Sequence, residues 1–271
     1  MQKHDNKLEV LVAAQGIQNE SQMPPVLRQL LSSGFPTVLI NQTKNDKQLS
    51  STSKSLRIFN YAEKGISRSR KRALEHATGD ILLLSDEDVE LIDGFSDTIK
   101  KAFEKNPQAD VITFQCLNEH GALRKSYPEH AIKHNMRTLM QVSSVEVALR
   151  RASFENGSVR FDERFGIGSE IPTGSETVFL SDALKQGLKI LYQPEPIVRH
   201  PDESSGRTLF RNTRMIRAKG AMFHRIFGWK AYLVSLLFAV KKRKETGFSL
   251  FRTAHLMYSG IEEFKRLDHG E

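Results

Sequence analysis

The sequence predicts an α/β fold built around a mostly parallel sheet. In the first half of the chain, short apolar runs of the length of buried strands alternate with stretches whose apolar residues recur at helical spacing. This alternation is typical of parallel sheets with helices on their faces. The chain has 271 residues, of which 39% are hydrophobic, so it can form one large domain with an appendage.

The expected elements follow in order along the chain. Strands are predicted at 8–13, 37–40, 56–59, 81–84, 111–116, 142–149 and 189–192. Helices are predicted at 24–33, 67–77, 95–103 and 176–186, the first and last of them ended by glycine. From residue 207 onward the pattern is helical and basic. The sequence therefore predicts a Rossmann-like sheet flanked by helices, followed by a C-terminal basic helical extension.

The cysteine content and the N-terminal residues bear on the compartment. Cys116 is the only cysteine, which excludes an internal disulfide and a multi-cysteine zinc site. It lies in a strand-like apolar run, so a buried structural thiol is expected. The first seven residues are polar and carry no apolar leader. We therefore expect a protein of the reducing cytoplasm.

The net charge of +8 is concentrated in one segment. From Arg199 to Lys244 there are twelve Lys or Arg residues and two acids, a local charge of +10, which leaves 8 − 10 = −2 for the rest of the chain. A nucleic-acid-binding protein is disfavoured, because the charge is confined to one region and no motif with interleaved stacking aromatics accompanies it. The basic segment therefore needs an explanation of its own.

Two carboxylates, Asp86 and Asp88, follow the predicted strand at 81–84 directly. Ligands of open α/β sheets gather outside the carboxyl ends of the strands. Two acids two residues apart at such an end can hold one hard cation through oxygen and leave positions for phosphate oxygens and water. A solvated acidic turn, or a cap for the next helix, is the alternative.

Two further motifs have an alternative interpretation as well. The basic stretch 63–72, with Arg70 on its predicted helix, suits either an anion site at a helix N-terminus or a solvated basic face. In the glycine-rich region 157–200, Glu176 opens a predicted helix. It is placed either to deprotonate a sugar hydroxyl or to interact with the helix dipole. His200 is either a third metal ligand or a structural histidine.

The order of the motifs carries a family resemblance. The segments 65–74, 79–88, 161–166, 174–180 and 187–190 occur in a sequence that resembles the inverting family 2 glycosyltransferases of the GT-A fold, over roughly residues 8–201. The segments 41–42, 62–65 and 109–112 are most similar to members that build bacterial surface polysaccharides such as capsule. The resemblance implies a metal-dependent hexosyltransferase-like enzyme with a nucleotide-sugar donor, a UDP-sugar being favoured, and a glycan or lipid-linked glycan acceptor.

The resemblance also implies a role for individual residues. Asp88 would be the main protein ligand of a divalent cation, Mn²⁺ or Mg²⁺. Asp86 would contact the ribose or the metal, and His200 falls where some members place a residue near the metal and the diphosphate. Arg70 would help to hold the nucleotide. Glu176 occupies the position at which these enzymes usually carry an aspartate base.

The chain departs from the family pattern at the expected nucleotide contacts. The first strand runs into Ala13 and Gln15 instead of a Thr-Tyr-Asn-like turn, and the second leads into Asn41 and Gln42 instead of acids. Amides can still hydrogen-bond the edge of a base, so all four stay candidate nucleotide contacts. The family usually has a Glu-Asp pair where this chain has Ser175 and Glu176. One carboxylate is therefore kept, on a side chain that is longer by one methylene group.

The predicted organisation is a catalytic domain at 1–201 and a basic helical region at 202–271. The nucleotide-sugar half would cover about 1–118 and the acceptor half about 119–201. Within the basic region, the apolar run 231–240 is too short to span a bilayer, which needs about 20 residues. Two alternatives stay open for 207–244: an interfacial helix on the anionic inner face of the cell membrane, or a helix packed on the catalytic domain.

Two rival functions share this fold. A non-catalytic subunit of a membrane polysaccharide-assembly complex would keep the sheet but lose the nucleotide contacts. A sugar nucleotidyltransferase usually opens with a glycine-rich loop that bears Arg or Lys, and no such loop follows Ala13. The transferred sugar, the acceptor, the linkage and the oligomeric state are not encoded in these motifs.

Overall fold

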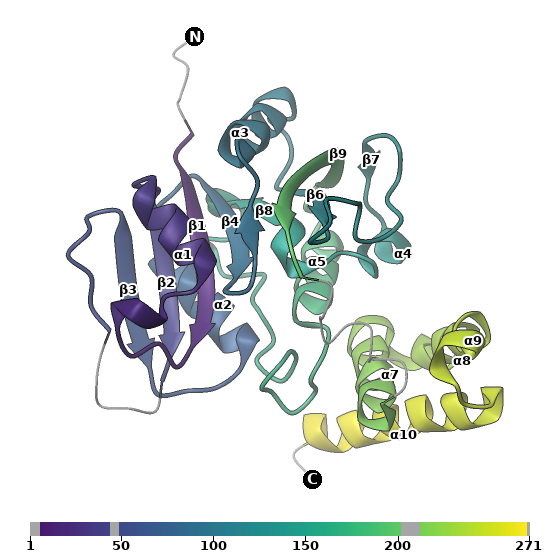
Figure 1. The fold of residues 1–271 in the computed structure, drawn as a ribbon. Helices are drawn as coiled ribbons and strands as arrows, with labels where there is room; N and C mark the ends of the chain where they lie inside the picture. The colour runs from purple at the N-terminus through teal and green to yellow at the C-terminus, as the bar shows by residue number, and fades with distance from the viewer. Residues whose placement is uncertain (1–5, 44–48, 202–211, 270–271) are drawn as a thin grey trace.

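The protein folds around one large sheet with helices on both of its faces (Figure 1). The computed structural model describes residues 6–43, 49–201 and 212–269. The strands are β1 (Leu8–Gln15), β2 (Thr37–Gln42), β3 (Leu56–Tyr61), β4 (Ile81–Asp86), β5 (Glu90–Leu91), β6 (Val111–Leu117), β7 (Ile132–Lys133), β8 (Val147–Arg150) and β9 (Ile190–Arg199). Strands from the N-terminal part of the chain form a parallel block, as expected, and antiparallel pairs in the rest make the sheet mixed.

The strands follow the order β3-β2-β1-β4-β8-β6-β9-β5, and β7 pairs with β9. The first four strands in this order are parallel to one another. β8 runs antiparallel between β4 and β6, and β6 is parallel to β9. The carboxyl ends of β1, β2 and β4 therefore lie along one edge of the sheet, which is the lower edge in Figure 1.

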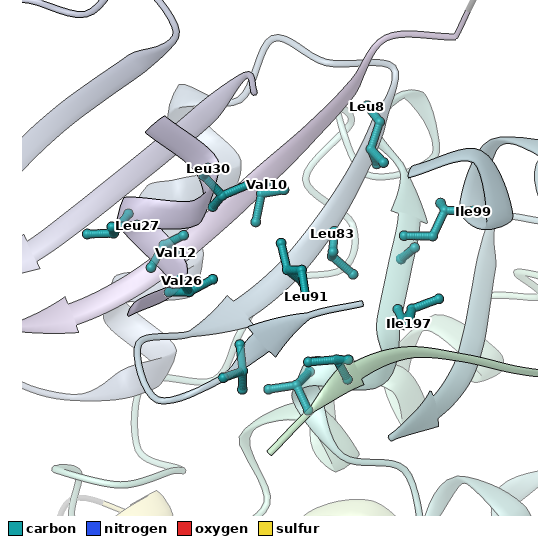
Figure 2. Packing of buried hydrophobic residues seen from close by; sticks show 14 of the residues in the cluster. Leu8, Val10, Val12, Val26, Leu27, Leu30, Leu83, Leu91, Ile99 and Ile197 are labelled. Atoms are coloured by element: carbon teal, nitrogen blue, oxygen red, sulfur yellow. The ribbon is translucent and has the colours of Figure 1, made fainter. Parts of the chain in front are cut away.

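Apolar side chains on both sides of each central strand explain why the sheet is buried. In β1, Leu8, Val10 and Val12 belong to one hydrophobic cluster and Leu11 to another, because successive side chains of a strand point to opposite faces. Helices α1 (Pro25–Ser32) and α3 (Phe95–Lys105) cover the first face, which Figure 2 shows. Helices α2 (Ile66–His76) and α5 (Ser175–Lys185) cover the second. The predicted α/β class is confirmed.

Short helical segments connect the larger elements. They are α4 (Met136–Leu139) and the 3₁₀ turns η1 (Glu20–Gln22), η2 (Ser144–Glu146), η3 (Arg151–Ser153) and η5 (Gly228–Lys230). The strand predicted at 142–149 was wrong in its first half, where η2 replaces it. The side chains of Ser143 and Glu146 cap this turn reciprocally, and the cap holds the backbone away from the extended conformation.

The last strand is longer than the prediction of 189–192. It continues as β9 through Pro194 and Pro196 to Arg199. Pro196 lies opposite Gln115, between two shifts in register with β6. Proline is tolerated there because an irregular ladder does not require its missing N–H donor.

Within residues 212–269 the structure describes four helices: α7 (Thr213–Phe227), α8 (Ala231–Lys241), α9 (Arg243–Thr246) and α10 (Leu250–His269). Buried residues of α7 and α10 join one cluster with Phe165 and Val178, which precede or belong to α5. Most of the expected boundary at 201–206 lies outside the described residues. Among the helices that the structure describes, none has the length and apolar character that crossing a bilayer requires.

Candidate functional site

The predicted donor-site residues gather at the carboxyl ends of the parallel strands. Asp86 is the last residue of β4, and in the strand register it lies opposite Ala13 of β1. Two residues further along β1, Gln15 lies opposite Gln42 of β2. The short polar segment that follows β4 carries Asp88. The fold therefore brings these residues to one edge, as their positions after strands predicted.

Arg70 contacts both Asp86 and Glu176, two carboxylates from separate sequence motifs. It projects from α2 and is only 5% exposed. Its Nη2 donates to Oδ1 of Asp86 at 2.8 Å, and its Nη1 lies 3.7 Å from Oε2 of Glu176. The predicted donor-side acid and the predicted base thus share one guanidinium, whose charge offsets their mutual repulsion.

A buried hydroxyl pair fixes the start of α5 beside α2. The Ser67 hydroxyl donates to the carbonyl of Phe165 at 2.6 Å and lies 2.7 Å from the Ser175 hydroxyl. Because Ser67 has a single hydroxyl proton, Ser175 must donate to Ser67. This leaves the Ser175 oxygen to accept from Arg70, at 3.2 Å. These contacts set the position of Glu176, the next residue.

Glycine allows the loop before α5 to approach the start of α2. Gly65 precedes α2 with φ of 122°, and an added Cβ there would lie 2.9 Å from the Ser169 hydroxyl oxygen. Gly168 has φ of 83°, and a Cβ on it would lie 3.2 Å from the Gly65 backbone. Both residues need the left-handed conformation and the close contact that only glycine permits. The two motifs proposed for donor and acceptor are therefore adjacent.

Ser144 is a site residue that the sequence analysis missed. Its hydroxyl donates to Oδ2 of Asp86 at 3.1 Å, so Arg70 and Ser144 each hold one oxygen of this carboxylate. The serine lies in η2, where a strand was expected. The pattern Ser143-x-x-Glu146, a capping-box signature, was visible in the sequence and would have indicated a turn at this point.

Asp88 and His200 form the pair that could hold a cation. Asp88 is 58% exposed, and its Oδ1 lies 3.5 Å from Nε2 of His200, which is nearly buried. The other ring nitrogen, Nδ1, lies 2.9 Å from the carbonyl oxygen of Pro201. A carbonyl can only accept, so Nδ1 must carry a proton. In the neutral ring Nε2 then presents a lone pair toward Asp88, as a metal-binding histidine does.

The donor set of this pair fits a cation that takes its remaining ligands from a substrate. Among residues 6–43, 49–201 and 212–269, no three His, Cys, Asp or Glu side chains are grouped to hold a metal. One carboxylate oxygen and one imidazole nitrogen would suffice if phosphate oxygens and water complete the shell. Both of the Asp86 oxygens already accept hydrogen bonds, although a carboxylate has further lone pairs.

A third acid concentrates negative charge in the same segment. Glu87 accepts a hydrogen bond from the Gln15 N–H at 3.4 Å. Burial raises the pKa of Glu87, and the neighbouring Asp88 and Asp86 raise it further, whereas the bond from Gln15 opposes the rise. Burial is the largest cause of this rise, and the three neighbouring carboxyl groups are a place where a cation would relieve repulsion between like charges.

The amides after β2 are engaged within the protein. Asn41 is fully buried: its Oδ1 accepts from the N–H of Ile17, and its Nδ2 donates to the Ile17 carbonyl and to Asn60. Gln42 exchanges two hydrogen bonds with the backbone of Gly65, at 3.0 and 3.2 Å. The two amides therefore fix the loops after β1 and before α2. Their contact with a nucleobase stays a prediction.

Helix α7 covers the start of α5, in agreement with the second of the two alternatives left open for 207–244, a helix packed on the catalytic domain. A Cβ on Gly174 would lie 2.7 Å from Met222 of α7, so the two helices meet at this glycine. Lys219, one turn earlier on α7, lies near Glu176. Burial lowers the pKa of Lys219, and the Glu176 carboxylate opposes that fall. The C-terminal region thus places a lysine amine near the predicted base.

The sheet order, the acidic end of β4 and the helices on both faces define the class, a GT-A-like glycosyltransferase fold. Solved structures of S. aureus TarS share it. TarS 1–349 in complex with UDP-GlcNAc aligns with a TM-score of 0.58 at 12% identity, covering 98% of this chain and 92% of that one. The complex with UDP aligns with a TM-score of 0.54 at 16% identity, covering 90% and 72%.

A longer TarS chain aligns with a TM-score of 0.56 at 14% identity over 87% of this chain, which spans 43% of that TarS chain. No family model and no curated protein matches the sequence. At these identities the likeness shows the fold alone. It confirms the fold class expected from the order of the motifs.

Proposed function

We propose that the protein is a metal-dependent inverting glycosyltransferase. It transfers a sugar from a nucleotide-diphosphate sugar to a glycan or lipid-linked glycan acceptor, in the synthesis of bacterial cell-surface polysaccharide. The observation that carries the proposal is the guanidinium of Arg70 between Asp86 and Glu176. Asp86 lies at the acidic end of β4, where a nucleotide diphosphate would bind, and Glu176 would accept the proton of the acceptor hydroxyl. The contacts of Arg70 hold these two carboxylates close together.

A UDP-sugar is the favoured donor. Solved structures with the same fold contain UDP and UDP-GlcNAc, both in TarS. In this chain the donor would lie along the carboxyl ends of β1, β2 and β4, as ligands of open α/β sheets do. Arg70 and Ser144 hold Asp86 in place there, Ala13 of β1 lies opposite it in the strand register, and the Gln15 N–H donates to the neighbouring Glu87.

The residues divide the chemistry between a departing and an attacking group. Glu176 accepts the proton of the acceptor hydroxyl, and the oxygen then bonds to the anomeric carbon from the side opposite the diphosphate. The bond from that carbon to the diphosphate oxygen breaks, and the nucleoside diphosphate leaves with the electron pair. Asp88 and His200 would hold a divalent cation, Mn²⁺ or Mg²⁺, which would stabilise the charge on the leaving diphosphate.

The non-catalytic subunit remains the rival function, and the internal hydrogen bonds of Asn41 are the observation that favours it. Calorimetry with UDP and Mn²⁺ separates the two. A transferase should bind each ligand more tightly in the presence of the other, because phosphate oxygens and protein side chains share the cation. A scaffold should bind neither.

A screen of nucleotide sugars for metal-dependent release of nucleoside diphosphate tests the proposal directly. We expect slow hydrolysis of one donor in the presence of Mn²⁺ or Mg²⁺, and its loss in Asp88→Ala. Asp97→Ala is the matched control, because Asp97 is an exposed acid on α3. Absence of release from every donor, with or without a glycan acceptor, would contradict the proposal.

A further inference from the structure

Helix α8 presents four large apolar residues to solvent, whereas Tyr232, Val234 and Phe238 pack partly against the neighbouring helices. Ala231, Ser235 and Ala239, spaced by four residues, are buried against the rest of the C-terminal region. The exposed residues define what we call the α8 surface: Trp229, Leu233, Leu236, Leu237 and Val240. Their spacing places them on one side of the helix.

The exposure of this surface is large for a packed helix. Trp229 is 77% exposed, Leu233 is 62% exposed and Leu237 is 61% exposed. A helix that serves only to pack on a domain directs its large apolar residues inward and its small or polar residues outward. In α8 the fully buried residues are the small ones, and three leucines and a valine face outward. Contiguous apolar exposure of this kind marks an interaction site.

Cations border the α8 surface at both ends. Lys230 lies beside Trp229 at its start, with Nζ 5.8 Å from the ring centroid. Lys241, Arg243 and Lys244 are exposed at its end. Between Glu203 and Glu245 the sequence contains no acid. An acidic protein partner could pair with the cations but would leave the leucines exposed to water. An anionic lipid surface could pair with the cations and also bury the leucines.

We propose that the α8 surface docks on an anionic lipid membrane, with the helix lying in the interface. The apolar side chains would enter the boundary between headgroups and acyl chains, and the cations would contact the phosphates. In Figure 1, α8 and α9 lie at the end of the C-terminal helices away from the sheet, so the surface is free of the candidate site. The proposal does not depend on the transferase activity.

Trp229 makes the proposal directly measurable, because it is the only tryptophan in the sequence. We expect its emission to shift to the blue, and the full chain to sediment with vesicles, when phosphatidylglycerol is mixed into phosphatidylcholine. Vesicles of phosphatidylcholine alone and high salt should weaken both effects. Each cation replaced in Lys241→Gln or Lys244→Gln should weaken binding about fivefold.

The double variant Leu233→Ser with Leu237→Ser should lose both the shift and the sedimentation. Leu123→Ser is the matched control, because Leu123 is 50% exposed in another part of the fold and should leave both intact. Circular dichroism confirms that each variant is folded. Sedimentation without a change in Trp229 emission would overturn the proposal. So would a dimer in solution that the double variant dissociates while vesicles are not bound, since the surface would then join two copies.

Discussion

At the scale of the residue, Arg70 connects parts of the chain that are distant in sequence. It lies on α2, is nearly buried, and donates hydrogen bonds to Asp86 from β4 and Ser175 from α5. A buried cation that neutralises two acids holds them at a fixed separation. Arg70 is therefore a positioning residue for Asp86 and Glu176. This role does not depend on a contact between Arg70 and a nucleotide.

Replacement of Arg70 by methionine should destabilise the fold, because Asp86 and Glu176 would face each other without a cation. We expect a loss of about 3 kcal/mol in the free energy of unfolding, the lower end of the range for a broken buried pair. Arg68→Met, at an exposed arginine on the same helix that pairs with the partly exposed Glu163, should cost less than about 1 kcal/mol. Urea unfolding measures both, and equal losses would contradict the role of Arg70.

His134 should make stability depend on pH. Its ring lies between the hydroxyls of Thr113 and Thr138, and burial lowers its pKa to about 4, with a further contribution from Lys125. In the unfolded chain a histidine has a pKa of about 6.5. The contribution of the neutral ring is therefore complete above about pH 6.5 and falls by about 3 kcal/mol as the pH drops toward 4.

Urea unfolding across that pH range tests this expectation. The variant His134→Gln should lose less stability than the parent chain between neutral pH and about pH 4, because its side chain does not titrate. Parallel curves for the two proteins would show that His134 is not the titrating group.

At the scale of the element, the C-terminal helices meet by backbone contact. A Cβ on Gly220 of α7 would overlap the carbonyl oxygen of Met257, and a Cβ on Gly260 of α10 would overlap that of Arg217. The two glycines therefore set how closely α7 and α10 approach.

Gly220→Ala should accordingly destabilise the C-terminal region. Alanine gains about 1 kcal/mol of helix propensity, but the overlap should cost more, and we expect a net loss of about 2 kcal/mol. His255→Ala, at an exposed position on α10, is the control and should be nearly neutral. Thermal unfolding compares them, and a stabilised Gly220→Ala would contradict the close crossing.

The sequence predicted correctly those elements whose structure depends on their own residues, such as strands with unbroken apolar runs. The runs at 81–84 and 111–116 became β4 and β6 because unbroken apolar residues suit a strand buried on both faces. The prediction failed at 142–146, where a capping box outweighed the apolar pattern. The prediction also ended the last strand too early, at residue 192. The strand continues through Pro194 and Pro196 because its pairing with β6 is irregular and tolerates proline. Neither outcome depends on hydrophobicity alone.

At the scale of the whole molecule, part of the candidate site followed from strand ends and motif order. Asp86 and Glu176 could be placed at the site because each follows or begins an expected element. The contacts of Arg70 with both, and of Ser144 with Asp86, could not be predicted, because they join segments through tertiary packing. The position of Lys219 near Glu176 also depends on how α7 packs on α5.

The central claim is that Glu176 is the base in a site that binds its donor through other residues. Comparison of Glu176→Gln with Glu104→Gln, an exposed glutamate on α3, tests it most directly. With a donor and acceptor that the parent chain uses, we predict that Glu176→Gln lowers turnover by about 10²–10⁴-fold, while its affinity for UDP with Mn²⁺ and the activity of Glu104→Gln are unchanged. Unchanged turnover in Glu176→Gln would contradict the account.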